Sequence, residues 1–126
     1  MHKSRLSGFI IDCQTDDLEG SAKFWAGALG APAETRPQSD DGPYIALEVA
    51  KGEPYVEVQK VAHPSRAHID IEADDIPAEV ERLENLGAKK ITEIKDWVVM
   101  AAPTGQHFCV VPVIRAGFDD NANTWK

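Results

Sequence analysis

The sequence is poor in the features that mark several common protein classes. It has only two cysteines among 126 residues, and they do not form a Cys-x-x-Cys pair. Its apolar runs all fall short of the roughly 20 residues that a membrane-spanning helix needs. A glycine-rich phosphate loop and a G-x-S-x-G nucleophile elbow are also missing. These absences argue against a disulfide scaffold, a membrane protein, a P-loop nucleotidase and an α/β-hydrolase.

Basic residues are scarce relative to acidic ones, 13 against 21, which gives a formal net charge of -8. This charge repels phosphate backbones, and no basic patch interleaved with aromatic residues is present, so we expect no nucleic-acid partner. The acidity fits either solubility or a preference for cationic ligands, and the sequence leaves both open. Residues 1–6 carry charge but are not followed by the long apolar region of a signal peptide, so we expect a cytoplasmic protein with no membrane partner. We expect its cysteines to be reduced.

The stretch Ala67–Asp75 combines a strand, a turn and the start of a helix. In a strand, His68 and Asp70 share one face while Ile69 and Ile71 share the other. The isoleucine face is expected to pack on a core. The polar face is therefore expected to meet water, a cavity or a ligand.

The same unit occurs earlier in the chain, 58 residues before. Adding 58 places Asp12 on Asp70 and Ile11 on Ile69, and each half reads as strand, helix and three strands. Two repeats are too few for a solenoid. We predict one domain over residues 1–126, with modules at about 6–61 and 67–113 and a tail at 114–126.

Hydrophobic periodicity and turn residues predict the individual elements. Because successive side chains of a strand point to opposite faces, we expect Cys13 and Cys109 on opposite sides of the sheet. The first module is expected to contain a strand at 6–13, a helix from Asp16–Asp17 to Gly30, a short strand at 33–36, a loop at 37–42 and a hairpin of 44–49 with 55–61. The second is expected to contain a strand from 68, a helix from 76 closed by Gly87, and strands at 89–94, 97–101 and 108–113.

Several strings in this order resemble the glyoxalase/bleomycin-resistance/dioxygenase (vicinal oxygen chelate) superfamily, in its glyoxalase-like domain branch. They are Phe9-Ile10-Ile11-Asp12-Cys13, Phe24-Trp25, Leu29-Gly30, His68-Ile69-Asp70, Asp74-Asp75 and Pro103-Thr104-Gly105-Gln106-His107-Phe108-Cys109. The resemblance implies an α+β fold of two tandem βαβββ modules that form one curled, cup-shaped mixed sheet, with helices outside and a ligand or metal inside. The superfamily includes lyases, isomerases, ring-cleaving dioxygenases, thiol transferases and drug-binding proteins, so the fold alone does not determine the function.

The resemblance also implies where a metal would bind. Metal-using members take one ligand from the first and one from the last strand of each module. The corresponding positions hold Ile10, His68, Glu57 (or Gln59) and Cys109. Ile10 cannot bind a metal, and Cys109 replaces a usual glutamate. His68 and Glu57 suit Mn²⁺ or Fe²⁺, whereas His68, Glu57 and Cys109 suit Zn²⁺. Alternatively, His68 forms a hydrogen-bonded pair with Asp70, or lines a wet cavity without a metal.

Other candidate residues lie on the same strands. Asp12 and Asp70 are symmetric carboxylates that could serve as acid and base together with His68, or could instead cap backbone N–H groups. Tyr44 and Trp97 are core aromatics by default and are candidate walls for a flat ligand. The full set of ligand-binding candidates is Glu57, Gln59, Cys109, Trp97 and Tyr44.

Two functions are consistent with these residues. The first is a small-molecule binding protein of the glyoxalase/bleomycin-resistance type, with the ligand in the cup between the modules. The second is a divalent-metal-dependent lyase, isomerase or dioxygenase of the same fold. Because edge strands and the apolar tail residues Phe118 and Trp125 need cover, and because the family commonly pairs chains, we also expect a homodimer.

Overall fold

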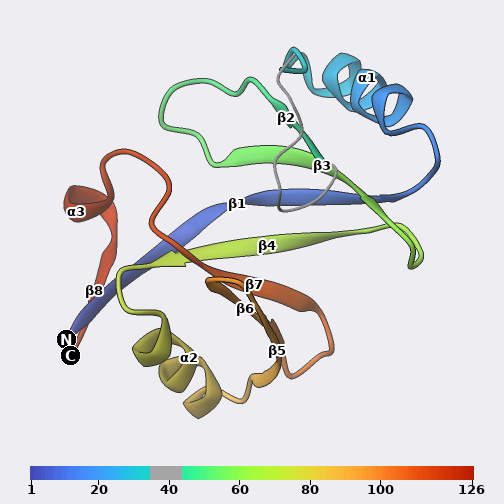
Figure 1. The fold of residues 1–126 in the computed structure, drawn as a ribbon. Helices are drawn as coiled ribbons and strands as arrows, with labels where there is room; N and C mark the ends of the chain where they lie inside the picture. Colours follow the sequence, from blue (N-terminus) through green and yellow to red (C-terminus); the bar gives the residue numbers. More distant parts are fainter. Residues whose placement is uncertain (35–43) are drawn as a thin grey trace. The chain divides into compact units, whose positions relative to one another are not determined.

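The computed structural model describes residues 1–34 and 44–126 of the chain (Figure 1). The loop predicted at 37–42 therefore lies outside the described residues. The described part divides into two compact units: unit 1 comprises Met1–Ser7 with His68–Lys126, and unit 2 comprises Gly8–Ala67. The boundary follows Ala67, and the first seven residues belong to the same unit as the second half of the chain.

Within these described ranges the second module has the predicted order of strand, helix and three strands, the first has one strand fewer, and the tail adds a helix and a strand. The elements are β1 (His2–Gln14), α1 (Leu18–Leu29), β2 (Tyr44–Leu47), β3 (Tyr55–Val61), β4 (Arg66–Ala73), α2 (Ile76–Asn85), β5 (Lys89–Ile94), β6 (Trp97–Ala101), β7 (His107–Pro112), α3 (Phe118–Asn121) and β8 (Asn123–Trp125). Of the short strand predicted at 33–36, Ala33 forms an isolated bridge to Leu47, and residues 35 and 36 are outside the described ranges. The α+β class is confirmed.

Unit 2 places its strands in the order β2-β3-β1, with β1 and β3 parallel and β2 and β3 antiparallel. Helix α1 covers one face of this sheet. Its Leu18 and Ala22 are buried against Cys13 and Val58, and Trp25 packs at the edge of the same cluster. Apolar side chains at helical spacing thus meet the apolar face of the strands, as the periodicity predicts.

Unit 1 places its later strands in the order β4-β7-β6-β5. Strands β4 and β7 are parallel, and β7, β6 and β5 are successively antiparallel. Helix α2 buries Val80 and Leu83 against Val98, Met100 and Val110. The predicted bounds of β5 and β6 agree with the structure.

Both long helices begin at an aspartate. Asp17 accepts a hydrogen bond from the N–H of Gly20 at 3.0 Å, and Asp75 accepts one from the N–H of Ala78 at 3.1 Å. Helix α1 ends at Gly30, whose φ of 67° lies in the left-handed region that glycine adopts readily. None of the described helices is long and apolar enough to cross a membrane.

The tail is the part of the fold that the sequence did not predict. It forms α3 and β8, and β8 pairs with the start of β1, with His2 opposite Trp125. Phe118 is buried at 6% exposure. The indole of Trp125 donates a hydrogen bond to Ser4 at 2.8 Å and carries the guanidinium of Arg82 above its ring. Phe118 and Trp125 are therefore covered by their own unit, which removes one reason for expecting a partner subunit there.

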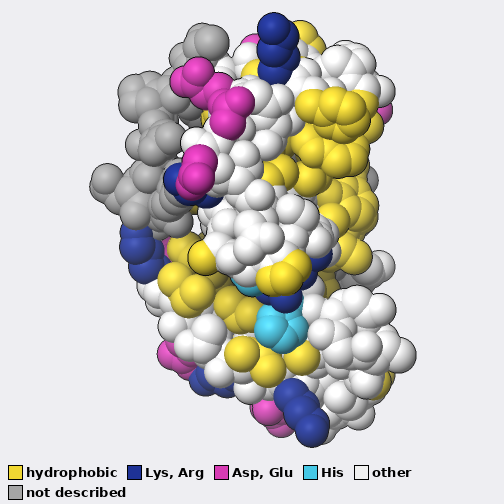
Figure 2. Space-filling view, turned by 90° about the vertical axis from the view of Figure 1, so that its right-hand side faces the viewer, with side chains coloured by type: hydrophobic (Ala, Val, Ile, Leu, Met, Phe, Trp, Pro, Cys, Tyr) yellow, Lys and Arg dark blue, Asp and Glu magenta, His cyan; other side chains and the backbone are white. Residues whose placement is uncertain are grey.

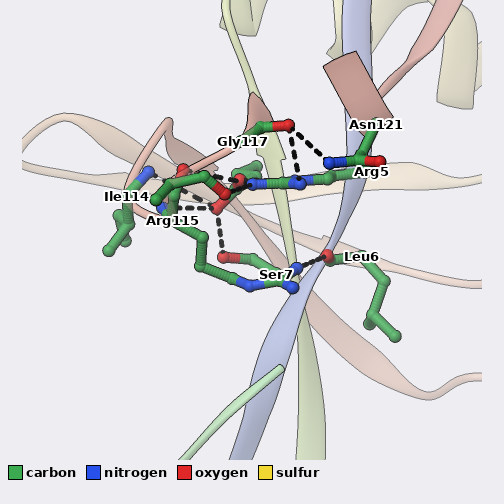
Figure 3. A network of polar contacts seen from close by, with 9 residues as sticks. Arg5, Leu6, Ser7, Ile114, Arg115, Gly117 and Asn121 are labelled. Carbon is green, nitrogen blue, oxygen red and sulfur yellow. Dashed lines mark hydrogen bonds and ion pairs between the residues drawn. The ribbon is translucent and has the colours of Figure 1, made fainter. Parts of the chain in front are cut away.

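A buried ion pair holds this tail in place (Figure 3). Glu72 is fully buried, and its carboxylate accepts hydrogen bonds from Arg5 Nε at 2.8 Å and Ser7 Oγ at 2.7 Å. It also accepts the backbone N–H groups of Ile114 and Arg115. The other nitrogens of Arg5 donate to the carbonyls of residues 115–117. Glu72 shares the polar face of β4 with His68 and Asp70, but it stabilises the fold rather than facing a ligand.

Candidate functional site

Unit 1 has one sheet face that α2 leaves uncovered. Asp70 lies opposite Cys109 in the β4–β7 pair, and Cys109 lies opposite Val99 in the β6–β7 pair. Directly paired residues project from the same face, so these side chains form a row across three strands. The alternate residues Ile71, Val98 and Val110 point the other way, into the cluster beneath α2. His68 and Asp70 thus lie on the helix-free face, as strand parity predicts.

His68, Asp70 and Cys109 converge on this face. One potential ligand atom from each lies within 4.8 Å of the others. His68 Nε2 and Asp70 Oδ1 are 3.7 Å apart, with side chains 14% and 10% exposed. This separation suits an ion pair with a protonated imidazole and is longer than a normal hydrogen bond. The three groups offer an imidazole, a carboxylate and a thiol to one point in space.

Such a trio can act in two ways. An imidazole with a carboxylate nearby can accept a proton from a bound molecule, because the carboxylate stabilises the imidazolium that forms. Nitrogen, oxygen and sulfur ligands together also suit Zn²⁺, which accepts three protein ligands and a water. Mn²⁺ and Fe²⁺ prefer carboxylates to a thiolate, so Cys109 shifts the preference of the cluster toward zinc.

The neighbouring side chains extend the face with apolar surface and a second histidine. Trp97 and Ala101 lie two residues before and after Val99 in β6 and so share its face of the sheet. His107 lies opposite Ala101. All are partly exposed. Trp97 was predicted from the sequence, whereas His107 was not. The strand register supplies the signal for it: Cys109 is paired with Asp70 as Gln59 is with Asp12, which makes His107 the counterpart of Glu57.

The remaining predicted residues lie on the helix-free face of unit 2. Glu57 is opposite Ile10, and Gln59 is opposite both Asp12 and Tyr44. Their alternate neighbours in the strands pack under α1. All eight predicted site residues are therefore on the side of their sheet away from the helix, four in each unit.

Asp12 has a charged partner within unit 2. Its side chain is 2% exposed, and Oδ2 lies 3.8 Å from Nε of Arg66, which is 46% exposed. Backbone N–H groups were the partners predicted for this carboxylate, and its arginine partner was not predicted. Asp70 belongs to the other unit, so the idea of a symmetric acid–base pair stays a prediction.

The cysteines lie where parity predicts. Both are free, Cys13 is buried under α1 and Cys109 is half-buried on the helix-free face of unit 1. The expectation that both thiols stay reduced remains a prediction. Of the two thiols, Cys109 is the one that a ligand or metal can approach.

Comparison with known proteins identifies the family of this chain. The model of the glyoxalase-like domain matches residues 8–111. The chain belongs to the glyoxalase-like domain family. This family lies within the vicinal oxygen chelate superfamily that the sequence motifs indicate. No curated protein matches the glyoxalase-like chain in sequence.

Solved structures share the fold at low sequence identity. Methylmalonyl-CoA epimerase from Mycobacterium tuberculosis is 14% identical, with a TM-score of 0.61 over 86% of this chain and 88% of that one. A methylmalonyl-CoA epimerase in complex with methylmalonyl-CoA and NH4⁺ is 13% identical, with a TM-score of 0.57 over 92% and 97%. The 2,2',3-trihydroxybiphenyl 1,2-dioxygenase of Sphingomonas wittichii is 17% identical, with a TM-score of 0.58 over 90% of this chain and 42% of that one. These likenesses establish the fold of the glyoxalase-like chain and not its reaction.

Proposed function

We propose that this glyoxalase-like protein binds a small organic molecule on the helix-free face of unit 1. His68, Asp70 and Cys109 meet the polar part of the ligand, and Trp97 meets a flat or apolar part. The observation that carries this proposal is the convergence of three reactive side chains on a sheet face that no helix covers. Binding sites commonly combine apolar walls with a few convergent polar groups.

His68 is the group we propose for proton transfer if the bound molecule reacts. Its imidazole can take a proton from a carbon or oxygen acid, and Asp70 then stabilises the positive charge at 3.7 Å. Glu57, Gln59, Tyr44 and Asp12 form a separate set of candidate ligand contacts in this proposal, on the helix-free face of unit 2.

The second candidate function is metal-dependent catalysis by a lyase, isomerase or dioxygenase. The distances within the His68, Asp70 and Cys109 cluster favour a lyase or isomerase, because the zinc that suits these ligands has no redox chemistry for a dioxygenase. Asp70 supplies the carboxylate that the sequence analysis assigned to Glu57, so a complete three-ligand set exists within one unit. When bound there, zinc would polarise an oxygen of the substrate or activate a water. The chain's part is to hold the ion with these three side chains.

Two measurements on the purified protein separate these functions. Metal analysis after purification without chelators tests for a stoichiometric ion, and His68→Ala should remove it. A melting-temperature screen with 2-oxo compounds, coenzyme A thioesters and cationic glycopeptides tests for a ligand, because any molecule that binds only the folded state raises its stability. A ligand that stabilises the metal-free protein and has no effect on His68→Ala supports the binding function. Equal stabilisation of both proteins would contradict the proposed site.

We also propose that the protein acts as a homodimer in the cytoplasm. Free cysteines support the reducing compartment. Exposed apolar side chains outside the tail support the dimer, although Phe118 and Trp125 do not.

A further inference from the structure

Asp12 is a buried charge that the proposed proton transfer at His68 does not use. Its side chain is 2% exposed and lies on the helix-free face of unit 2, because its neighbours Ile11 and Cys13 pack under α1. A carboxylate in such a place is costly unless a cation accompanies it. Arg66 supplies the cation, with Nε 3.8 Å from Oδ2 of Asp12. Because this carboxylate is on the helix-free face, the guanidinium of Arg66 reaches the same face.

The ion pair holds Arg66 without saturating it. The side chain of Arg66 is 46% exposed, and 3.8 Å is longer than a hydrogen bond between nitrogen and oxygen. Asp12 therefore attracts the guanidinium without occupying the N–H donor that faces it. Arg5 of unit 1 gives the contrast, because Glu72 and the carbonyls of residues 115–117 take up its donors. A guanidinium with accessible donors presents a planar fork that matches the paired oxygens of a carboxylate.

Strand register places neutral polar groups beside this ion pair. Asp12 lies opposite Gln59, and Gln59 lies opposite Tyr44. Directly paired residues project from the same face, so the three side chains form a row across β1, β3 and β2. The Gln59 amide and the Tyr44 hydroxyl can donate hydrogen bonds, and the Tyr44 ring offers a flat apolar surface. Both side chains are partly exposed, so a ligand can reach them.

We propose that this row binds an organic carboxylate with a flat body, and that Arg66 recognises the carboxylate group. The guanidinium meets the oxygens of the ligand, Gln59 adds a hydrogen bond, and the ring of Tyr44 packs on the flat body. This inference rests on the part of the proposed function that assigns ligand contacts to unit 2. It adds Arg66 to those contacts and gives the ligand a charge and a functional group.

The charges around the row favour a carboxylate over a phosphate or a cation. Glu57 lies two residues before Gln59 on the same face of β3, about 7 Å along the strand. On the face of the molecule drawn in Figure 2, Lys and Arg side chains are scattered singly rather than gathered in a patch. A doubly charged phosphate would therefore meet strong repulsion, whereas a single negative charge is held by paired hydrogen bonds from one guanidinium. A cation would be repelled by Arg66 at this end of the row.

Titration of the isotope-labelled full chain with benzoate, followed by two-dimensional NMR, tests the proposal. The Nε–H group of an arginine gives its own signal, so binding at Arg66 is observed directly. We expect this signal and the backbone signals around Asp12 and Gln59 to shift, with a dissociation constant on the order of 1 mM for so small a ligand. Benzamide, which is uncharged, and benzylammonium, which is cationic, should each bind at least about tenfold more weakly.

Arg66→Lys separates carboxylate recognition from a structural role. Lysine keeps a positive charge beside Asp12, so the fold should be retained, but it lacks the planar fork, and the affinity for benzoate should fall at least about tenfold. Gln59→Ala leaves the ion pair intact and should also weaken binding. The matched control is Lys60→Gln, which removes a positive charge from the residue after Gln59, on the opposite face of β3, and should leave binding unchanged.

Several results would overturn the inference, and they differ in what else they affect. Benzoate that does not bind the wild type up to about 20 mM would remove the carboxylate site, and equal affinities of wild type and Arg66→Lys would remove the role of Arg66. Neither result affects the small-molecule site on unit 1, which His68→Ala tests separately. Benzoate binding that is lost in His68→Ala and kept in Arg66→Lys would overturn this inference while supporting the proposed function of unit 1.

Discussion

Asp70 and Cys109 are directly opposite residues in the parallel pair of β4 and β7. This pairing places a carboxylate and a thiol side by side on the helix-free face, with His68 at the next position on that face of β4. Sheet register, rather than a loop, therefore sets the geometry of the candidate site. Sites built on strands hold their side chains more rigidly than sites built on loops.

The accessibility of the two thiols provides the first prediction. Cys109 is half-buried on an uncovered face and Cys13 lies in the core beneath α1, so a thiol reagent should modify Cys109 much faster than Cys13. If the cluster binds zinc, adding Zn²⁺ should slow the modification of Cys109. With a reagent that releases a chromophore, absorbance measures both rates of modification. The Cys109→Ser variant should lack the fast phase of this reaction. Similar rates at both cysteines would contradict the assigned faces.

His68→Ala is expected to abolish ligand or metal binding with little change in melting temperature. The imidazole lies on the helix-free face of the sheet and not among the apolar side chains beneath α2, so its removal leaves no cavity in that core. Calorimetric titration and thermal denaturation measure the two effects separately. A structural histidine would behave differently, since its loss would leave buried partners unpaired and cost about 1 to 3 kcal/mol.

Glu72→Gln should strongly destabilise the fold. The substitution removes the charge that pairs with Arg5, whose side chain is only 10% exposed, and breaking one side of a buried ion pair costs about 3 to 5 kcal/mol. The tail should loosen as well, because Arg5 also donates hydrogen bonds to its carbonyls. Urea unfolding measures the free energy, and Glu84→Gln on exposed surface serves as the control. Equal stability of the two variants would mean that Glu72 does not hold the tail.

Glu79 should make the stability depend on pH in the acid range. Its burial alone would raise the pKa, but hydrogen bonds from Arg82, His2 and Ser4 outweigh burial and lower the pKa of Glu79 below its usual 4.5. The carboxylate therefore contributes stability that is complete above about pH 4.5 and is lost as the pH falls through the lowered value.

Unfolding free energies of wild type and Glu79→Gln, measured from pH 7 down to pH 3, check this expectation. The difference between the two proteins should be largest at neutral pH and should shrink as the pH falls below about 4.5. Glu81→Gln on the same helix is the control and should show no such trend. A difference that is constant with pH would contradict the role of Glu79.

Two patterns predicted most of the fold and the candidate site: the alternation of side chains along strands and the spacing of apolar residues along helices. They placed His68, Asp70 and Cys109 on the helix-free face, because side chains alternate along a strand whatever its surroundings. They did not predict that Arg5 would pair with Glu72, or that Arg66 would pair with Asp12. These pairs join residues far apart in the sequence and depend on register between strands, which composition does not reveal. His107 was missed for the same reason, since its equivalence to Glu57 follows from the observed pairing.

The pairing of β1 with β8 has a consequence for how the chain can be rearranged. Because His2 lies opposite Trp125, the two chain ends are neighbours in unit 1 (Figure 1). A short linker could join them, and new ends could be opened at Gly52, in the exposed turn that precedes β3. In such a circular permutant β8 and β1 would become consecutive in the sequence. Their pairing, which now joins the two ends of the chain, would then form as a local hairpin.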